Sequence, residues 1–118
     1  MTKKQVAIQN KKMKSLNRIL HCAENHLLSY KPYYERDYRF CAIGCLFDKE
    51  LLATFACGDE SARYLFIQYP GLCFDTGLSV SEAHTIQTRH DNLTLNVNRV
   101  SIFVKQVKSW ISSKGVIV

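Results

Sequence analysis

Residues 100–111 read Val-Ser-Ile-Phe-Val-Lys-Gln-Val-Lys-Ser-Trp-Ile, and their apolar side chains recur at the i, i+3, i+4, i+7 steps of one helical face. The apolar positions are Val100, Phe103, Val104, Val107, Trp110 and Ile111. Polar residues fill the other positions, so the pattern predicts an amphipathic helix that buries one side. Asn96 stands just before this helix and is the candidate for its N-cap.

A second helix is predicted over residues 4–29, again from apolar residues spaced three and four apart. Its stripe comprises Met13, Leu16, Ile19, Leu20, Ala23, Leu27 and Leu28. Pro32 disfavours helical geometry at Lys31, so the helix should end before that point. Residues 31–40 then form a polar loop that is rich in tyrosine.

The middle of the chain begins with two shorter helical signals. Residues 41–56 carry cysteines and leucines that could line one helix face, although Gly44 within it costs about 1 kcal/mol relative to alanine. Asp59 is the candidate cap of a short helix that passes through Phe66 and stops at Pro70-Gly71.

Ser79 and Glu82 have the spacing of a capping box, which predicts a helix over residues 80–90. After it, apolar and polar residues alternate over residues 93–97, so a short strand is also possible there.

These segments predict an all-α fold: a single domain, residues 1–118, built as a small bundle of four to five helices. A chain of 118 residues can bury a core without metal or disulfide. The protein should be a monomer or a homodimer. We expect one core to contain Cys41, Ile43, Leu46, Phe103, Val107 and Trp110.

Composition also predicts the cellular compartment in which the protein is found. No apolar run approaches the roughly 18–20 residues of a membrane span, and no apolar segment follows the basic N-terminus as a secretory signal requires. The five cysteines are an odd number, which is typical of free thiols in a reducing compartment. We therefore expect a cytoplasmic protein with no membrane partner.

Charge divides the chain into three parts, although the net charge is only +6. Residues 1–18 contain six bases, residues 93–118 contain four, and neither segment contains an acid. All ten carboxylates lie between Glu24 and Asp91. If the two ends pack together, they form one basic face that includes Lys11, Lys12 and Lys14. Such a face could attract phosphate, anionic lipid or an acidic protein, or could simply be a solvated surface.

Two short blocks contain the residues that could act together in catalysis: Arg39–Phe47, with Cys41 and Cys45, and Gln87–Asn92, with His90 and Asp91. Cys41 at a helix N-terminus could serve as a nucleophile, with His90 as its base and Asp91 or Asn92 orienting the ring, as in Cys-His hydrolases or transferases. Because His90 and Asp91 are adjacent, this orientation needs a tight local turn. The alternative is that the cysteines fill the core and the His-Asp pair shapes a turn.

A metal site is another interpretation of the same residues. Cys41, Cys45 and His90 supply ligand types that zinc takes. His84 is six residues from His90 and would point in roughly the opposite direction on a helix. The spacing is wider than the usual pairs of structural zinc sites, and we expect neither a metal nor another cofactor.

Aromatic and arginine side chains crowd the loop before the first block. They are Tyr33, Tyr34, Arg36, Tyr38 and Arg39. Such residues are enriched in protein interfaces, could stack on single-stranded bases, or could cover the core. They are candidate partner-binding residues together with Lys11, Lys12 and Lys14.

The two blocks resemble those of small bacterial proteins of phage and prophage origin, which carry a CA-[IV]-GCL block followed by [LI]-Q-x-x-HD. Here the blocks read Cys41-Ala42-Ile43-Gly44-Cys45-Leu46 and Ile86-Gln87-Thr88-Arg89-His90-Asp91. The stretch after the first block, Phe47-Asp48-Lys49-Glu50, departs from that family's Ile-Pro-acid pattern. The resemblance implies an accessory protein of a mobile element that acts inside a bacterium.

From these observations the sequence predicts a protein that is not an enzyme and that binds a host protein, in host takeover or against host defence. Nucleic-acid binding through the basic terminal helices is the first alternative, and we expect only weak, non-specific affinity for DNA. A Cys/His hydrolase or transferase is the second alternative.

Overall fold

A computed structural model describes residues 1–28, 41–47 and 62–118, and every structural statement below concerns those residues. Their helices are α1 (Lys3–Glu24), the 3-10 helix η1 (Gly44–Leu46), α3 (Ala62–Gln68), α4 (Gly71–Thr76), α5 (Val80–Asp91) and α6 (Arg99–Ser112). No β-strand occurs among them. The prediction of an all-α fold is confirmed.

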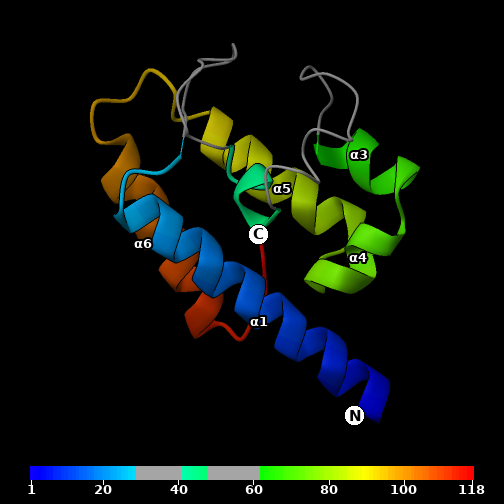
Figure 1. Ribbon diagram of the computed structural model, residues 1–118. Coiled ribbons are helices and arrows are strands. Elements are labelled where there is room, and N and C mark those ends of the chain that lie inside the picture. The colour runs from blue at the N-terminus through cyan, green and yellow to red at the C-terminus, as the bar shows by residue number, and fades with distance from the viewer. Residues whose placement is uncertain (29–40, 48–61) are drawn as a thin grey trace.

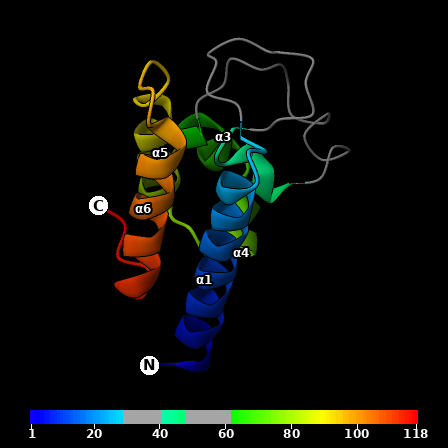
Figure 2. The same cartoon turned by 90° about the vertical axis from the view of Figure 1, so that its left-hand side faces the viewer.

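The long helix α1 runs through the middle of the assembly (Figure 1). It packs against α6 on one side and against α4 and η1 on the other, while α3 packs on α5. Helices α1 and α6 lie antiparallel, and the N-terminal end of α1 projects beyond the other helices (Figure 2).

The core forms where these helices meet. Leu16, Ile19 and Cys22 of α1 are buried, as are Phe103, Val107 and Trp110 of α6. Phe66 of α3 and Ile86 of α5 complete its centre. The apolar sides predicted for the first and last helices therefore face one another across a shared core. One member of the predicted core was wrong, because Cys41 is exposed, whereas Leu46 is half-buried and packs against the core.

Helix α1 begins with a capping box: the Thr2 hydroxyl accepts from the Gln5 N–H, and the Gln5 side chain accepts from the Thr2 N–H. The helix ends at Glu24, earlier than predicted. His26 takes a left-handed conformation with φ 56°, and the Leu27 N–H bonds back to the carbonyl of Cys22. This is a Schellman ending, so Leu27 and Leu28 lie outside the helix although they continue its apolar stripe.

The prediction of a continuous helix over residues 41–56 was wrong where the structure tests it. Only Gly44–Leu46 form a helical turn, of the 3-10 type. Phe47 then adopts extended geometry, with φ −118° and ψ 150°, and closes the turn by donating to the Gly44 carbonyl. Residues 48–56 lie outside the described part, as does the predicted cap Asp59.

Predictions for the second half of the chain agree with the structure in part. Helix α5 has the expected capping box between Ser79 and Glu82. Asn96 does not cap α6, because its side chain accepts instead from the N–H of Asn98, which is the N-cap position. Residues 93–97 form turns rather than a strand, and Asn96 N–H bonds to Leu93. Pro70 ends α3 as predicted, but the helix α4 that follows it was not anticipated.

Gly77 fixes the distance between α4 and α1. It ends α4 with φ 71°, and a Cβ atom there would lie 2.4 Å from both the Ile8 carbonyl oxygen and the Lys12 nitrogen of α1. Both neighbours are backbone atoms of a long helix, which cannot rotate aside. The position therefore requires glycine for its conformation and for its lack of a side chain.

We expect Gly77→Ala to lower the free energy of unfolding by about 2–4 kcal/mol, because left-handed strain adds to a backbone clash. Gly71→Ala in the same short helix is the matched control, since no atom lies within 4 Å of its Cβ position. Urea unfolding followed by circular dichroism measures both. Equal stability of the two variants would contradict this account of Gly77.

Candidate functional site

The two blocks singled out in the sequence lie against one another in the fold. The turn over residues 41–47, called here the cysteine turn, is held from two helices. From α5, the Gln87 side-chain oxygen accepts from the Ile43 N–H at 3.1 Å. From α1, Arg18 Nε donates to the Cys45 carbonyl oxygen at 3.4 Å. The cysteine turn thus connects α1 with α5.

The His-Asp pair extends this network. The Gln87 amide donates to Asp91 Oδ1 at 2.8 Å, and the same oxygen lies 3.3 Å from His90 Nδ1. His90 is fully buried with its ring edge-on to Phe103, at 5.0 Å between centroids, whereas Asp91 remains exposed. Asp91 therefore contacts the ring of His90, although the sequence analysis considered this contact difficult for two adjacent residues. The end of α5 supplies the tight arrangement that this contact needs.

Cys41 lacks the character of an activated nucleophile. It has exposed surface, but the protein around its sulfur desolvates a thiolate, and this desolvation raises the pKa of the thiol. A hydrogen bond from the Gly44 N–H opposes the rise, while the negative charge of Asp91 adds to it. An acid beside the thiol is the reverse of the electropositive setting that catalytic cysteines use.

Cys45 is a buried thiol. Its sulfur donates to the Ala42 carbonyl at 3.0 Å, and burial raises its pKa, with the neighbouring Cys22 adding to the effect. For metal binding, residues 1–28, 41–47 and 62–118 contain no group of three or more His, Cys, Asp or Glu side chains placed to hold an ion. His84 is exposed on α5, unlike the buried His90.

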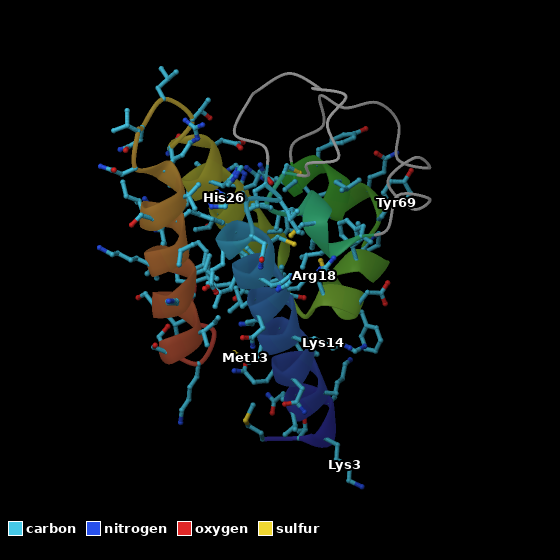
Figure 3. The ribbon with its side chains drawn as sticks, turned by 60° about the vertical axis from the view of Figure 1, so that its left-hand side comes forward. Lys3, Met13, Lys14, Arg18, His26 and Tyr69 are labelled. Carbon is cyan, nitrogen blue, oxygen red and sulfur yellow. The ribbon has the colours of Figure 1, made fainter. Side chains whose placement is uncertain are left out.

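A stripe of positive charge follows the flank of α1 beside α4 and η1, where Lys11 reaches Phe74 and Arg18 reaches the Cys45 carbonyl. Lys4, Lys11 and Arg18 are seven residues apart, which is almost two helical turns, so they lie along one line, with Lys14 beside it. Lys3, Lys4, Lys14 and Arg18 are exposed. Figure 3 shows Lys14 and Arg18 on the same side of α1 and Met13 on the other. We call Lys3, Lys4, Lys11, Lys14 and Arg18 the basic stripe.

The three lysines predicted to bind a partner have different surroundings. Lys14 is exposed, whereas Lys11 Nζ lies 3.4 Å above the centre of the Phe74 ring. Lys12 is held by Glu82 at 2.7 Å and by the Gly115 carbonyl at 3.3 Å, so it belongs to the fold. The predicted aromatic and arginine residues, Tyr33, Tyr34, Arg36, Tyr38 and Arg39, lie outside the described residues.

Sequence reasoning missed a groove between the first half of α1 and the α4–α5 corner. Its volume is about 440 Å³, and its walls include Gln5, Ile8, Lys12, Cys73, Phe74 and Leu78. Phe74 is 55% exposed. Helix α4 buries Leu72 and Thr76, which are four residues apart, and Phe74 lies on another side of the helix. We call this hollow the α1–α4 groove.

Comparisons of the chain with protein-family models, with curated proteins and with solved structures find no match. Within the described ranges, none of the helices combines the length and apolar character needed to cross a membrane. The assignment of function therefore depends on the thiols, the basic stripe and the groove.

Gln87→Ala should lower the free energy of unfolding by about 1–3 kcal/mol, because the Ile43 N–H would lose its acceptor at a partly buried site. Thr88→Ala, an exposed change one residue away on α5, should stay within about 0.5 kcal/mol of the parent. Equilibrium unfolding in urea compares the two. If Gln87→Ala were as stable as Thr88→Ala, the link between the cysteine turn and α5 would contribute nothing to stability.

We expect iodoacetamide to label Cys41 at neutral pH no faster than an ordinary exposed cysteine, because its raised pKa leaves little thiolate. The rate should rise with pH through a midpoint above the usual value of about 8.5. Mass spectrometry of the alkylated peptides measures it. Rapid labelling that disappears in a folded His90→Ala variant would instead favour the Cys/His enzyme.

Proposed function

We propose that this protein is a binding protein without enzymatic activity, and that its basic stripe docks on an acidic surface of another protein. The observation that carries the proposal is the arrangement of α1: one side is buried in the core, and the flank next to it exposes Lys3, Lys4, Lys14 and Arg18. With the resemblance to phage-type proteins, the proposed partner is a host protein in the bacterial cytoplasm, taken over or inhibited by the contact.

The surroundings of the thiols support the absence of catalysis. Cys41 is disfavoured as a thiolate, and His90 is buried against Phe103 at the junction of the two blocks. Their hydrogen bonds tie the cysteine turn to α5. A structural role is therefore enough to explain the two sequence blocks, and no substrate is needed to explain them.

Charge of this kind acts chiefly on the rate of encounter. Exposed lysines attract an acidic partner over distances near the Debye length, about 8–10 Å at physiological salt, and association slows as salt rises. Nucleic acid is the competing polyanion. Lys11 covers one face of the Phe74 ring, so only the other face of this exposed ring is open to a stacked base.

The test compares two charge-reversal variants with the same net charge. Lys4→Glu/Lys14→Glu alters the basic stripe, and Lys105→Glu/Lys108→Glu alters exposed lysines of α6. Lys12 is left intact because of its contact with Glu82. After capture from bacterial lysate, the purified partner should associate with the α1 variant about tenfold more slowly at low salt, with little change for the α6 variant. High salt should remove the difference.

Equal rates for both variants would contradict docking through the basic stripe. Recovery of nucleic acid alone, with an affinity that stays in the nanomolar range at physiological salt, would replace the proposal with the nucleic-acid alternative. The expected affinity for DNA is only about 10⁻⁴–10⁻⁶ M, as for non-specific contacts to phosphate.

A further inference from the structure

The first half of α1 has an uncovered side that the proposed charge contact does not explain. The N-terminal end of this helix projects beyond its neighbours (Figures 1 and 2), and from Ile8 onward α4 lies alongside it, with Gly77 against the Ile8 carbonyl. Ile8 is only half-buried there, beside Phe74, and both line the α1–α4 groove. Its volume, about 440 Å³, falls within the range of about 300–1,000 Å³ that is usual for ligand-binding pockets.

Positive charge borders this groove along the α4 side. Lys4 precedes Ile8 by one turn, and Lys11 follows it by three residues, so both lie on the same side of α1 as Ile8. Lys11 reaches over Phe74. Of the two nearby acids, Glu82 is neutralised by Lys12, which leaves Asp75 as the exposed acid of α4. The rim thus favours a negatively charged occupant.

The length of the groove indicates the form of that occupant. Its wall on α1 runs from Gln5 to Lys12, a rise of about 10 Å at 1.5 Å per residue. An amphipathic helix that binds in a groove places anchors at i, i+3 or i+4, and i+7, which is the same distance. We propose that the α1–α4 groove receives the apolar face of a short acidic helix of the partner protein. This inference rests on the proposed function and assigns it a specific site.

A second copy of this chain fits the groove less well. A symmetric contact through the first half of α1 would bring the two sets of Lys3, Lys4 and Lys11 close together, and like charges repel. An acidic partner helix meets the same lysines with attraction. The observations therefore favour a partner of opposite charge.

Cys73 provides a reporter inside the groove, while Cys41 lies outside its walls. The probe is a synthetic helical peptide with leucines at i, i+3, i+4 and i+7 and glutamates elsewhere. Iodoacetamide labelling of the full chain is followed at both cysteines by mass spectrometry. At ten times its Kd, the peptide should slow labelling of Cys73 about tenfold and leave Cys41 unchanged. A peptide with lysines in place of the glutamates is the charge control.

Phe74→Ala tests the apolar contact, and Ile67→Ala on α3 is its matched control, since the two side chains are 55% and 58% exposed. Fluorescence anisotropy should show Phe74→Ala weakening the glutamate peptide about tenfold or more, with no change for Ile67→Ala. No protection of Cys73 at millimolar peptide, equal protection by the lysine peptide, or a dimer that itself protects Cys73 would overturn the inference.

Experiments with the natural partner distinguish failure of this inference from failure of the proposed function. If the complex depends on Lys4 and Lys14 but leaves Cys73 as reactive as in the free protein, the groove is not its site and the proposed function stands. If neither the charge reversals nor Phe74→Ala affects the complex, both proposals fail.

Discussion

Burial of one side of α1 is the constraint on which the arrangement depends. Leu16, Ile19 and Cys22 contact the core, so α6 must lie along one flank of the helix and α4 along the other. Full burial of a leucine or isoleucine side chain contributes about 1.5–3 kcal/mol. With the helix fixed in rotation, the positions of its lysines are fixed as well. The same packing that forms the core therefore orients the charged surface toward solvent.

The cysteine turn has a complementary role. Hydrogen bonds within the seven-residue segment, such as Phe47 N–H to the Gly44 carbonyl, close its single 3-10 turn, and its neighbours attach this turn to the helices. Gln87 meets its backbone from α5, and Arg18 meets it from α1. The glutamine also bonds Asp91, so one side chain connects both sequence blocks. Residues that resemble a catalytic set in the sequence act here as a connection between distant segments.

Local signals made much of this fold predictable. Amphipathic spacing identified α1 and α6, and the Ser79–Glu82 capping box identified the start of α5. The end of α1 was not predictable, because the apolar stripe continues through Leu28 and no glycine marks the left-handed residue, His26. The bond between Gln87 and Ile43 joins residues 44 positions apart, which no local pattern reveals. Phe74 was missed because its exposure depends on how α4 packs against α1.

The projecting end of α1 divides one helix into two regimes of stability. Leu16 and Ile19 are fully buried, so we expect the amides around them to exchange only when a large part of the domain opens. Before Ile8 the amides lie on exposed turns, where exchange requires only fraying of the end. Ordering of these first turns by a ligand would then register as local protection from exchange, with the slowest amides of the same helix unaffected.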